Sequence, residues 1–140
     1  MTPIRKVGII GTGQMGSGIA HVVALSGYEV LLSDLSKERV DKGLEAIEKN
    51  LSRQIASGKI TDEDRKQALA RISYAESYQD LADADLVIEA ATEDETVKRK
   101  IFVSLCPFLS PDAIVATNTS SISITRLAAS TDRPEHFIGL

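Results

Sequence analysis

Short apolar runs alternate with longer amphipathic patterns along this chain, and that alternation is what most constrains its fold. Strands are expected at residues 6–10, 28–32, 70–74, 85–89, 113–117 and 136–140. Several of these runs are apolar at consecutive positions, as strands covered on both faces must be. Strands that alternate with helices form βαβ units, so the sequence predicts an α/β fold with a doubly wound, mainly parallel sheet.

An insertion at about residues 36–71 separates the second and third expected strands and is longer than a minimal crossover. Its first part carries an apolar stripe at helical spacing, formed by Val40, Leu44, Ile47, Leu51 and Ile55. Thr61 then precedes three acidic residues, which is typical of a helix N-cap and its first turn. The insertion is therefore expected to be a helical hairpin. A further helix is expected over residues 95–109, with a stripe of Val97, Ile101, Leu105 and Phe108.

Residues 11–16, Gly-Thr-Gly-Gln-Met-Gly, directly follow the first expected strand and precede a helix-forming stretch. Gly11 would permit a tight turn, Gly13 would let the backbone approach a pyrophosphate, and Gly16 would let the helix lie close to the strand. The start of that helix would offer free N–H groups to phosphates. A glycine-rich turn that binds nothing is the alternative, but the context favours a Rossmann-type dinucleotide site.

Asp34 ends the second expected strand, eighteen residues after Gly16. A carboxylate there can accept hydrogen bonds from both ribose hydroxyls of an adenosine and repels a 2′-phosphate. Two like charges about 4 Å apart at a protein surface cost on the order of a few kcal/mol. Neither Leu35 nor Ser36 supplies a cation for that phosphate, so NAD is favoured over NADP. A helix N-cap role for Asp34 is the alternative, and the two roles are compatible.

Two further polar clusters follow expected strands. Glu93 and Lys98 come after the strand at residues 85–89 and are candidates for the nicotinamide-ribose side. An acidic helix start with Lys98 on a solvated face is the alternative. Residues 117–121, Thr-Asn-Thr-Ser-Ser, follow the next strand and could by themselves be turn and capping residues. Because ligands bind where the carboxyl ends of parallel strands meet, the clusters together predict a site at that edge.

Composition argues against several other classes of protein. Twenty acidic and sixteen basic residues give a net charge of -4 without a basic block, so nucleic acid is not an expected partner. No apolar run approaches the roughly 20 residues of a membrane-spanning helix, and the N-terminus lacks a signal-peptide cleavage pattern. A single cysteine, Cys106, excludes an internal disulfide framework and a Cys-rich metal site, so no metal and a cytoplasmic location are expected.

Four segments, read together, resemble the N-terminal NAD-binding domain of the 3-hydroxyacyl-CoA dehydrogenases, especially the bacterial 3-hydroxybutyryl-CoA dehydrogenases. The segments are residues 7–16, 83–90, 118–125 and 133–140. The Asn-Thr-Ser-Ser segment and the Asp-Leu-Val-Ile-Glu-Ala strand are far more specific than the glycine loop. Lens λ-crystallin and the multifunctional fatty-acid oxidation proteins share the same pattern, so the resemblance identifies a family and not one protein.

The resemblance implies a role for each matching position. The adenosine diphosphate of NAD would bind at Gly11, Gly13, Gln14, Met15, Gly16 and Asp34. The nicotinamide half would contact Ala91, Glu93, Lys98 and Asn118. Ser120 matches the serine that hydrogen-bonds the 3-oxygen of the acyl-CoA substrate, and Lys59 is placed to bind a coenzyme A phosphate. Ser57 stands where some relatives carry a lysine, which is a departure from the pattern.

The same resemblance implies that the general base is a histidine one residue beyond Leu140, within His-Phe-Phe-Asn-Pro, and that His136 is not that residue. We therefore expect residues 1–140 to be a cofactor domain without the family's C-terminal helical domain. It would bind NAD without turnover, while the whole enzyme would be a homodimer that oxidises the 3-hydroxyl of an acyl-CoA. Two alternatives stay open: a non-catalytic, crystallin-like NAD-binding module, and a β-hydroxyacid dehydrogenase, which explains residues 11–16 but not 118–121.

Overall fold

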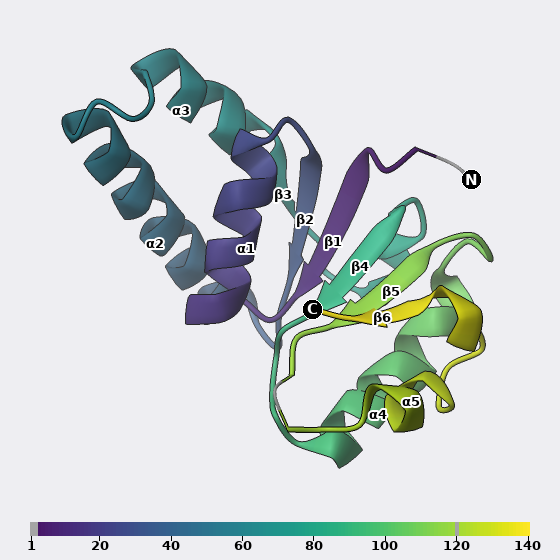
Figure 1. The fold of residues 1–140 in the computed structure, drawn as a ribbon. Coiled ribbons are helices and arrows are strands. Elements are labelled where there is room, and N and C mark those ends of the chain that lie inside the picture. The colour runs from purple at the N-terminus through teal and green to yellow at the C-terminus, as the bar shows by residue number, and fades with distance from the viewer. Residues whose placement is uncertain (1–2, 120) are drawn as a thin grey trace.

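Six parallel strands form one sheet in the order β3-β2-β1-β4-β5-β6 in the computed structural model, which describes residues 3–119 and 121–140. The strands are β1 Lys6–Ile10, β2 Glu29–Ser33, β3 Ile72–Tyr74, β4 Leu86–Glu89, β5 Ile114–Thr117 and β6 Phe137–Gly139. The chain begins at the centre of the sheet, winds out to β3, returns to β4 beside β1, and winds out to β6 (Figure 1). The predicted doubly wound α/β fold is confirmed, and every strand pair is parallel.

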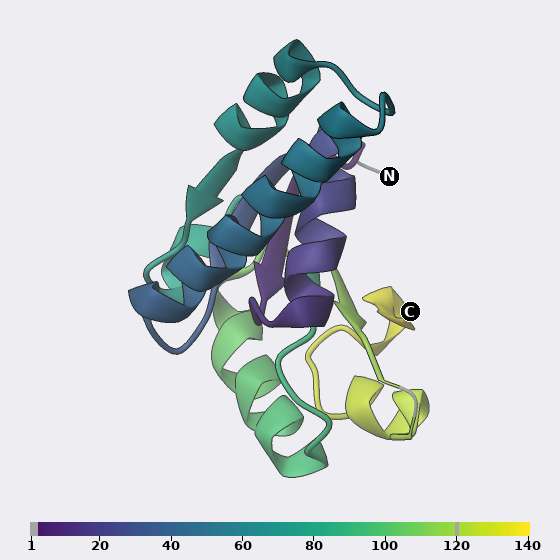
Figure 2. The same cartoon turned by 90° about the vertical axis from the view of Figure 1, so that its left-hand side faces the viewer.

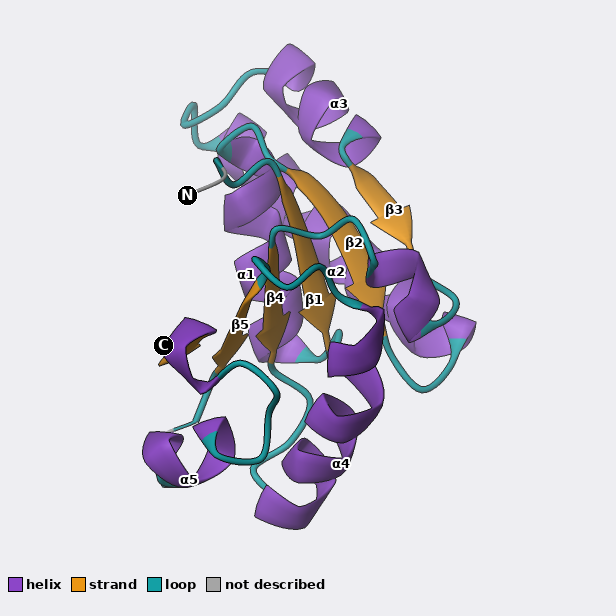
Figure 3. Ribbon diagram, turned by 90° about the vertical axis from the view of Figure 1, so that its right-hand side faces the viewer, coloured by secondary structure: helices purple, strands orange, loops and turns teal. Residues whose placement is uncertain are grey.

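Helices cover both faces of the sheet. They are α1 Gln14–Leu25, α2 Lys37–Ala56, α3 Asp62–Ala70, α4 Glu95–Leu105 and α5 Ile124–Ala128. Figure 2 shows α1 and the hairpin helices α2 and α3 over one face, and Figure 3 shows α4 and α5 beside the other. In the described part of the chain, no helix combines the length and the hydrophobicity that crossing a membrane requires.

The hairpin between β2 and β3 forms as its sequence predicts. Val40, Ile47 and Leu51 of the α2 stripe are at most 1% exposed and pack in one core cluster with Ala20 and Ala24 of α1. Thr61 caps α3, because its hydroxyl accepts from the Asp64 N–H at 3.1 Å while the Asp64 carboxylate accepts from the Thr61 N–H at 2.9 Å. The reciprocal bonds satisfy two N–H groups at the start of the helix.

Several element bounds differ from the expectation for local reasons. Ala70 is still helical, so β3 has only three residues instead of the expected five. The helix expected over 95–109 ends at Leu105, because a 3-10 turn that contains Pro107 follows at Cys106–Phe108 and proline lacks an amide hydrogen. The short helix α5 was not expected at all.

The buried face of α4 matches the predicted stripe only in part, because Leu105 is buried and Ile101 packs against the core while Val97 and Phe108 are exposed. The helix buries Lys98, Phe102 and Leu105, whereas Val97 is 43% exposed. Val97 and Ile101 line a cleft at the carboxyl edge of the sheet. The predicted apolar stripe did not include Lys98, which the structure buries next to Val97. The helix therefore turns one side to the core and another to the cleft.

Candidate functional site

The glycine loop between β1 and α1 has the geometry that its spacing predicts. Gly11 adopts a φ of +101°, and a Cβ there would lie 2.6 Å from the Ala91 Cα. A Cβ on Gly16 would lie 1.7 Å from the Gly11 carbonyl oxygen, so only glycine lets α1 lie this close to the loop. Both positions require glycine for steric reasons that do not depend on any ligand.

Gly13 differs from the other two loop glycines. It precedes α1 as the N-cap residue without a side-chain cap, and a Cβ there would meet no atom within 4 Å. Open space therefore borders the start of α1, where N–H groups lack helical partners and the helix dipole is positive. This arrangement fits a pyrophosphate. Gln14 and Met15 begin the helix, and their side chains line a separate groove on its outer surface.

A cleft of about 670 Å³ opens beside this loop at the carboxyl edge of the sheet. Its walls come from the glycine loop, the ends of β2 and β4, the 3-10 turn Tyr78–Leu81 and the helices α2 and α4. Of the residues predicted for the cofactor, the cleft brings together Gly11, Gly13, Asp34 and Ala91. Its mixed lining of backbone, carboxylate and apolar groups fits an adenosine and its phosphates.

Asp34 is fixed at the end of β2 by three hydrogen bonds. Its Oδ2 accepts from the Thr12 N–H at 2.8 Å and from the Thr12 hydroxyl at 2.7 Å, and its Oδ1 accepts from the Leu35 N–H at 2.6 Å. Partial burial would raise the pKa of Asp34, but these hydrogen bonds and the charge of Arg39 hold it below its ordinary value. The carboxylate is therefore ionised at neutral pH. The helix α2 is capped by Ser36, so the N-cap alternative for Asp34 is wrong.

Sequence reasoning missed several cleft residues, among them Arg39, Tyr78 and Glu76. Arg39 lies five positions after Asp34, and the first turn of α2 returns it to the cleft that Asp34 borders. Tyr78 comes from the 3-10 turn after β3, and burial raises the pKa of its hydroxyl together with the charges of Glu89 and Asp34. The sequence offered one signal for Arg39, because a helix that begins at Ser36 brings Arg39 into its first turn, close to Asp34. Nothing in the local pattern pointed to Tyr78.

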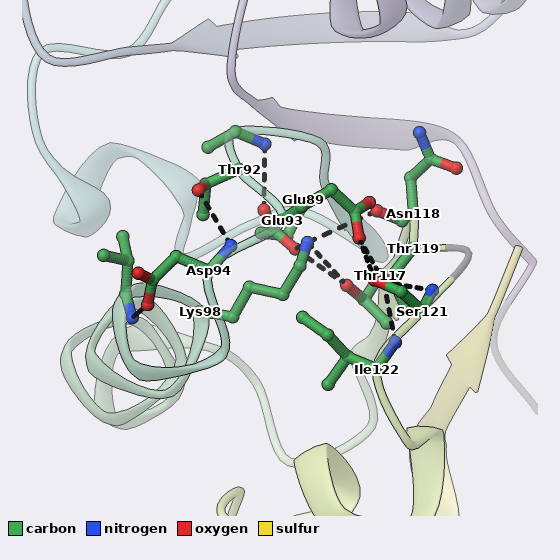
Figure 4. A network of polar contacts seen from close by, with 12 residues as sticks. Glu89, Thr92, Glu93, Asp94, Lys98, Thr117, Asn118, Thr119, Ser121 and Ile122 are labelled. Atoms are coloured by element: carbon green, nitrogen blue, oxygen red, sulfur yellow. Dashed lines mark hydrogen bonds and ion pairs between the residues drawn. The ribbon is translucent and has the colours of Figure 1, made fainter.

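A second cluster lies at the ends of β4 and β5, around a buried ion pair (Figure 4). Glu89 and Lys98 are each 0% exposed, and the Lys98 ammonium pairs with the Glu89 carboxylate. The Thr117 hydroxyl donates to Glu89 Oε1 at 2.7 Å, and the Ala91 N–H donates to Glu89 Oε2 at 2.8 Å. Such a network satisfies both buried charges and joins β4, β5 and α4 below the cleft rim.

Lys98 completes this network from α4. Its ammonium also donates to the Thr117 hydroxyl at 3.2 Å and to the Asn118 carbonyl at 3.3 Å. The alternative that placed Lys98 on a solvated face is therefore wrong, because pairing with Glu89 allows the charge to be buried. Glu89 was not predicted as a site residue, since it lies within an apolar strand. Contact between Lys98 and the nicotinamide half stays a prediction.

The loop after β5 is tied to Glu93. The Thr119 hydroxyl donates to Glu93 Oε2 at 2.8 Å, and the Ser121 hydroxyl donates to the same oxygen at 3.0 Å. In Figure 4 the Asn118 side chain points away from the Glu89–Lys98 pair. Ser120, predicted for the substrate oxygen, lies outside the described residues. The loops after β4 and β5 thus meet as the strand order requires.

Other candidate residues lie away from the carboxyl edge. Lys59 sits at the α2–α3 turn, next to Gly58 with a φ of +77°, at the far end of the hairpin (Figure 1). The chain has two histidines. His21 on α1 bonds Gln54 of α2 at 2.7 Å, and His136 borders a cavity with Ile4 at the amino ends of the strands. Within residues 3–119 and 121–140, no group of three or more His, Cys, Asp and Glu side chains could hold a metal ion.

Comparisons with known proteins agree with this geometry. Residues 6–140 match the family described as 3-hydroxyacyl-CoA dehydrogenase, NAD binding domain. A 3-hydroxybutyryl-CoA dehydrogenase of Bradyrhizobium diazoefficiens is 60% identical over 98% of this chain and 47% of its own length. A 3-hydroxyadipyl-CoA dehydrogenase of Escherichia coli is 41% identical over 100% of this chain and 30% of its own.

Solved structures give the same result. The crystal structure of (S)-3-hydroxybutyryl-CoA dehydrogenase from Ralstonia eutropha has a TM-score of 0.95 and 47% identity, over 98% of this chain and 48% of that one. A Mycobacterium tuberculosis structure has a TM-score of 0.95 and 43% identity, over 99% of this chain and 49% of that one. The chain thus spans about half the length of most curated relatives it matches.

Proposed function

The chain belongs to the 3-hydroxyacyl-CoA dehydrogenase family as its NAD-binding domain, and from that premise we propose that it serves the oxidation of a 3-hydroxyacyl-CoA. The proposed substrate is 3-hydroxybutyryl-CoA, as the names of the relatives indicate, and the product is the 3-ketoacyl-CoA. The observation that carries the proposal is the meeting of the glycine loop, Asp34 and the loops after β4 and β5 at one edge of the sheet. NAD, when bound, supplies the hydride acceptor.

The residues of this chain bind and orient in the proposed function. The start of α1 and the glycine loop hold the pyrophosphate, and Asp34 accepts a ribose hydroxyl. Ala91, Glu93, Lys98 and Asn118 are proposed for the nicotinamide half, and Ser120 for a hydrogen bond to the substrate 3-oxygen. Lys59 is proposed as a phosphate partner of coenzyme A. The buried Glu89–Lys98 pair supports this edge from below, because it joins the three elements that carry the loops.

We further propose that the 140-residue polypeptide binds NAD but does not turn over substrate at a useful rate. Neither histidine lies at the carboxyl edge, and an unactivated serine hydroxyl is not a general base. Loss of a general base typically costs about 10²–10⁴-fold in rate. In a protein of the relatives' length, the base and a helical domain that forms a homodimer are proposed to lie in the other half. A cytoplasmic location belongs to the same proposal.

The test compares this chain with a version extended to the length of the relatives. NAD binding is measured by calorimetry, and NADH formation from 3-hydroxybutyryl-CoA is followed by absorbance. We expect both proteins to bind NAD and only the longer one to turn over. Turnover by the short chain within about tenfold of the longer one would overturn the missing-base reasoning. NAD binding without turnover by the longer protein would instead favour the non-catalytic, crystallin-like module.

A further inference from the structure

Arg39 is a cation at the adenosine end of the cleft, and its charge contributes to the lowered pKa of Asp34. It lines the cleft together with Asp34 and Leu35, and the residue is exposed. Within residues 3–119 and 121–140, its guanidinium forms no hydrogen bond and no ion pair within 4.0 Å. Arginine presents several donors in a planar fork that matches a phosphate, so an uncommitted one is available for such a group.

The backbone of Arg39 is held close to the ribose-binding carboxylate. The Thr12 hydroxyl donates to Asp34 Oδ2 at 2.7 Å and also lies 3.0 Å from the Arg39 carbonyl oxygen. The Arg39 N–H donates to the Ser36 hydroxyl at 3.3 Å, in the capped first turn of α2. One threonine of the glycine loop therefore anchors both the acid and the segment that carries the cation.

Asp34 excludes a phosphate mainly by its charge. Three of its roughly four acceptor sites are already used by Thr12 and Leu35, which leaves capacity for about one ribose hydroxyl. A phosphate at that place would meet an ionised carboxylate that cannot turn away. Arg39 is the basic residue in the lining of this cleft within the described part of the chain, and Glu76 is the acidic residue that remains there when the Asp34 carboxylate is removed.

We propose that Arg39 is a second specificity-determining residue of the cofactor site, a cation for a 2′-phosphate that Asp34 masks. Removal of the Asp34 carboxylate is then sufficient to admit NADP(H), with no cation added. The proposal rests on the proposed function only in placing the adenosine of NAD beside Asp34.

The experiment is a set of calorimetric titrations with NADH, NADPH, 5′-AMP and 2′,5′-ADP. The proteins are wild type, Asp34→Ala, Asp34→Ala/Arg39→Gln and Asp34→Ala/Arg53→Gln. Arg53 is exposed near the other end of α2, about 20 Å along the helix at 1.5 Å per residue, so its loss changes net charge equally. If the Tm of Asp34→Ala is well below that of wild type, Asp34→Asn replaces it in all the variants.

We expect the Asp34 variant to gain affinity for NADPH and 2′,5′-ADP relative to wild type. Adding Arg39→Gln should then remove about tenfold to a hundredfold of that affinity, the range for a charged hydrogen bond. Adding Arg39→Gln should change the affinity for NADH and 5′-AMP by less than about threefold. Adding Arg53→Gln instead should leave the affinity for all four ligands at the level of the Asp34 variant. Equal losses for phosphorylated and unphosphorylated ligands, or none, would overturn the proposal. If wild type binds no NADH, the proposed function fails instead.

Discussion

Removing one member of the buried Glu89–Lys98 pair should destabilise the domain far more than removing both. In Lys98→Met the apolar stem of the side chain is kept, but the Glu89 carboxylate stays 0% exposed without its cation. Among the residues that the structure describes, the Thr117 hydroxyl and the Ala91 N–H are the donors that remain to it. Breaking a buried ion pair in this way typically costs about 3–5 kcal/mol.

The double variant Glu89→Gln/Lys98→Met separates the charge from the packing. The amide oxygen of the new side chain can accept from the Ala91 N–H, and no uncompensated charge remains. We expect it to be more stable than Lys98→Met by about 1–3 kcal/mol, because the desolvation penalty has gone. The wild-type domain has about 5–15 kcal/mol of total stability, so the single variant loses a large share of it.

Urea and thermal unfolding followed by circular dichroism measure these differences. A loss of about 3–5 kcal/mol corresponds to a drop in Tm of roughly 10–20 °C for a chain of this size. Lys100→Met is the matched control, since Lys100 is exposed on the same helix and should change stability by no more than about 0.5 kcal/mol. The single variant Glu89→Gln completes the comparison. If Lys98→Met costs less than about 1 kcal/mol, or if the effects of Glu89→Gln and Lys98→Met simply add in the double variant, the ion pair does not stabilise the edge as described.

Further predictions concern the loop, the acid and the sheet edge. Gly16→Ala should cost several kcal/mol, or prevent folding, because its Cβ would lie 1.7 Å from a loop carbonyl oxygen. Gly18→Ala, which meets no atom within 4 Å, should stabilise α1 by about 0.5–1 kcal/mol, and equal effects in urea unfolding would contradict the steric argument. The domain should bind NADH more tightly than NADPH, and Asp34→Ala should bring the two affinities closer together. Equal affinities of the wild-type domain for the two cofactors in calorimetry would refute this prediction. Because the pKa of Asp34 is lowered from its ordinary 3.8, its stabilising contribution is complete above that value and is lost as pH falls through the lower folded value. Acid unfolding curves of wild type and Asp34→Ala should therefore converge at low pH, and parallel curves would count against the hydrogen bonds assigned to it. Ile138 and Leu140 are 46% and 59% exposed at the outer strand, so the 140-residue chain should self-associate with concentration, and a monomeric sedimentation profile at high concentration would contradict this.

Sequence reasoning located the fold and the glycine loop because their signals are local. Gly16 is required by a contact with the Gly11 carbonyl in its own loop and Gly11 by a φ of +101°, so the spacing of the loop reveals them. The inward face of α4 could not be predicted in the same way. Lys98 is buried only because Glu89, on a strand nine residues earlier, supplies the opposite charge. The pattern of either segment alone does not show that these two charges pair with each other.

Arg39 shows a second limit of local reasoning. The positions immediately after Asp34 contain no cation, and that observation is correct. The turn of α2 nevertheless returns the fifth residue to the same cleft, and only the angle at which the helix leaves the strand decides this. Such angles depend on how the helix packs against the rest of the sheet, so they cannot be predicted from the sequence of one segment.

The two-sided helix α4 makes the length of the loop before it critical. Each residue turns an α-helix by about 100°, so deleting one residue between β4 and α4 would rotate the faces by more than a quarter turn. Lys98 would then take the place of Val97 at the cleft and Arg99 would take the buried place of Lys98, which would break the ion pair with Glu89 and deform the cleft wall together. Point substitutions on the exposed positions of α4 should be tolerated much better than any insertion or deletion ahead of it. In this part of the chain, spacing along the sequence is under stronger physical constraint than the identity of most residues.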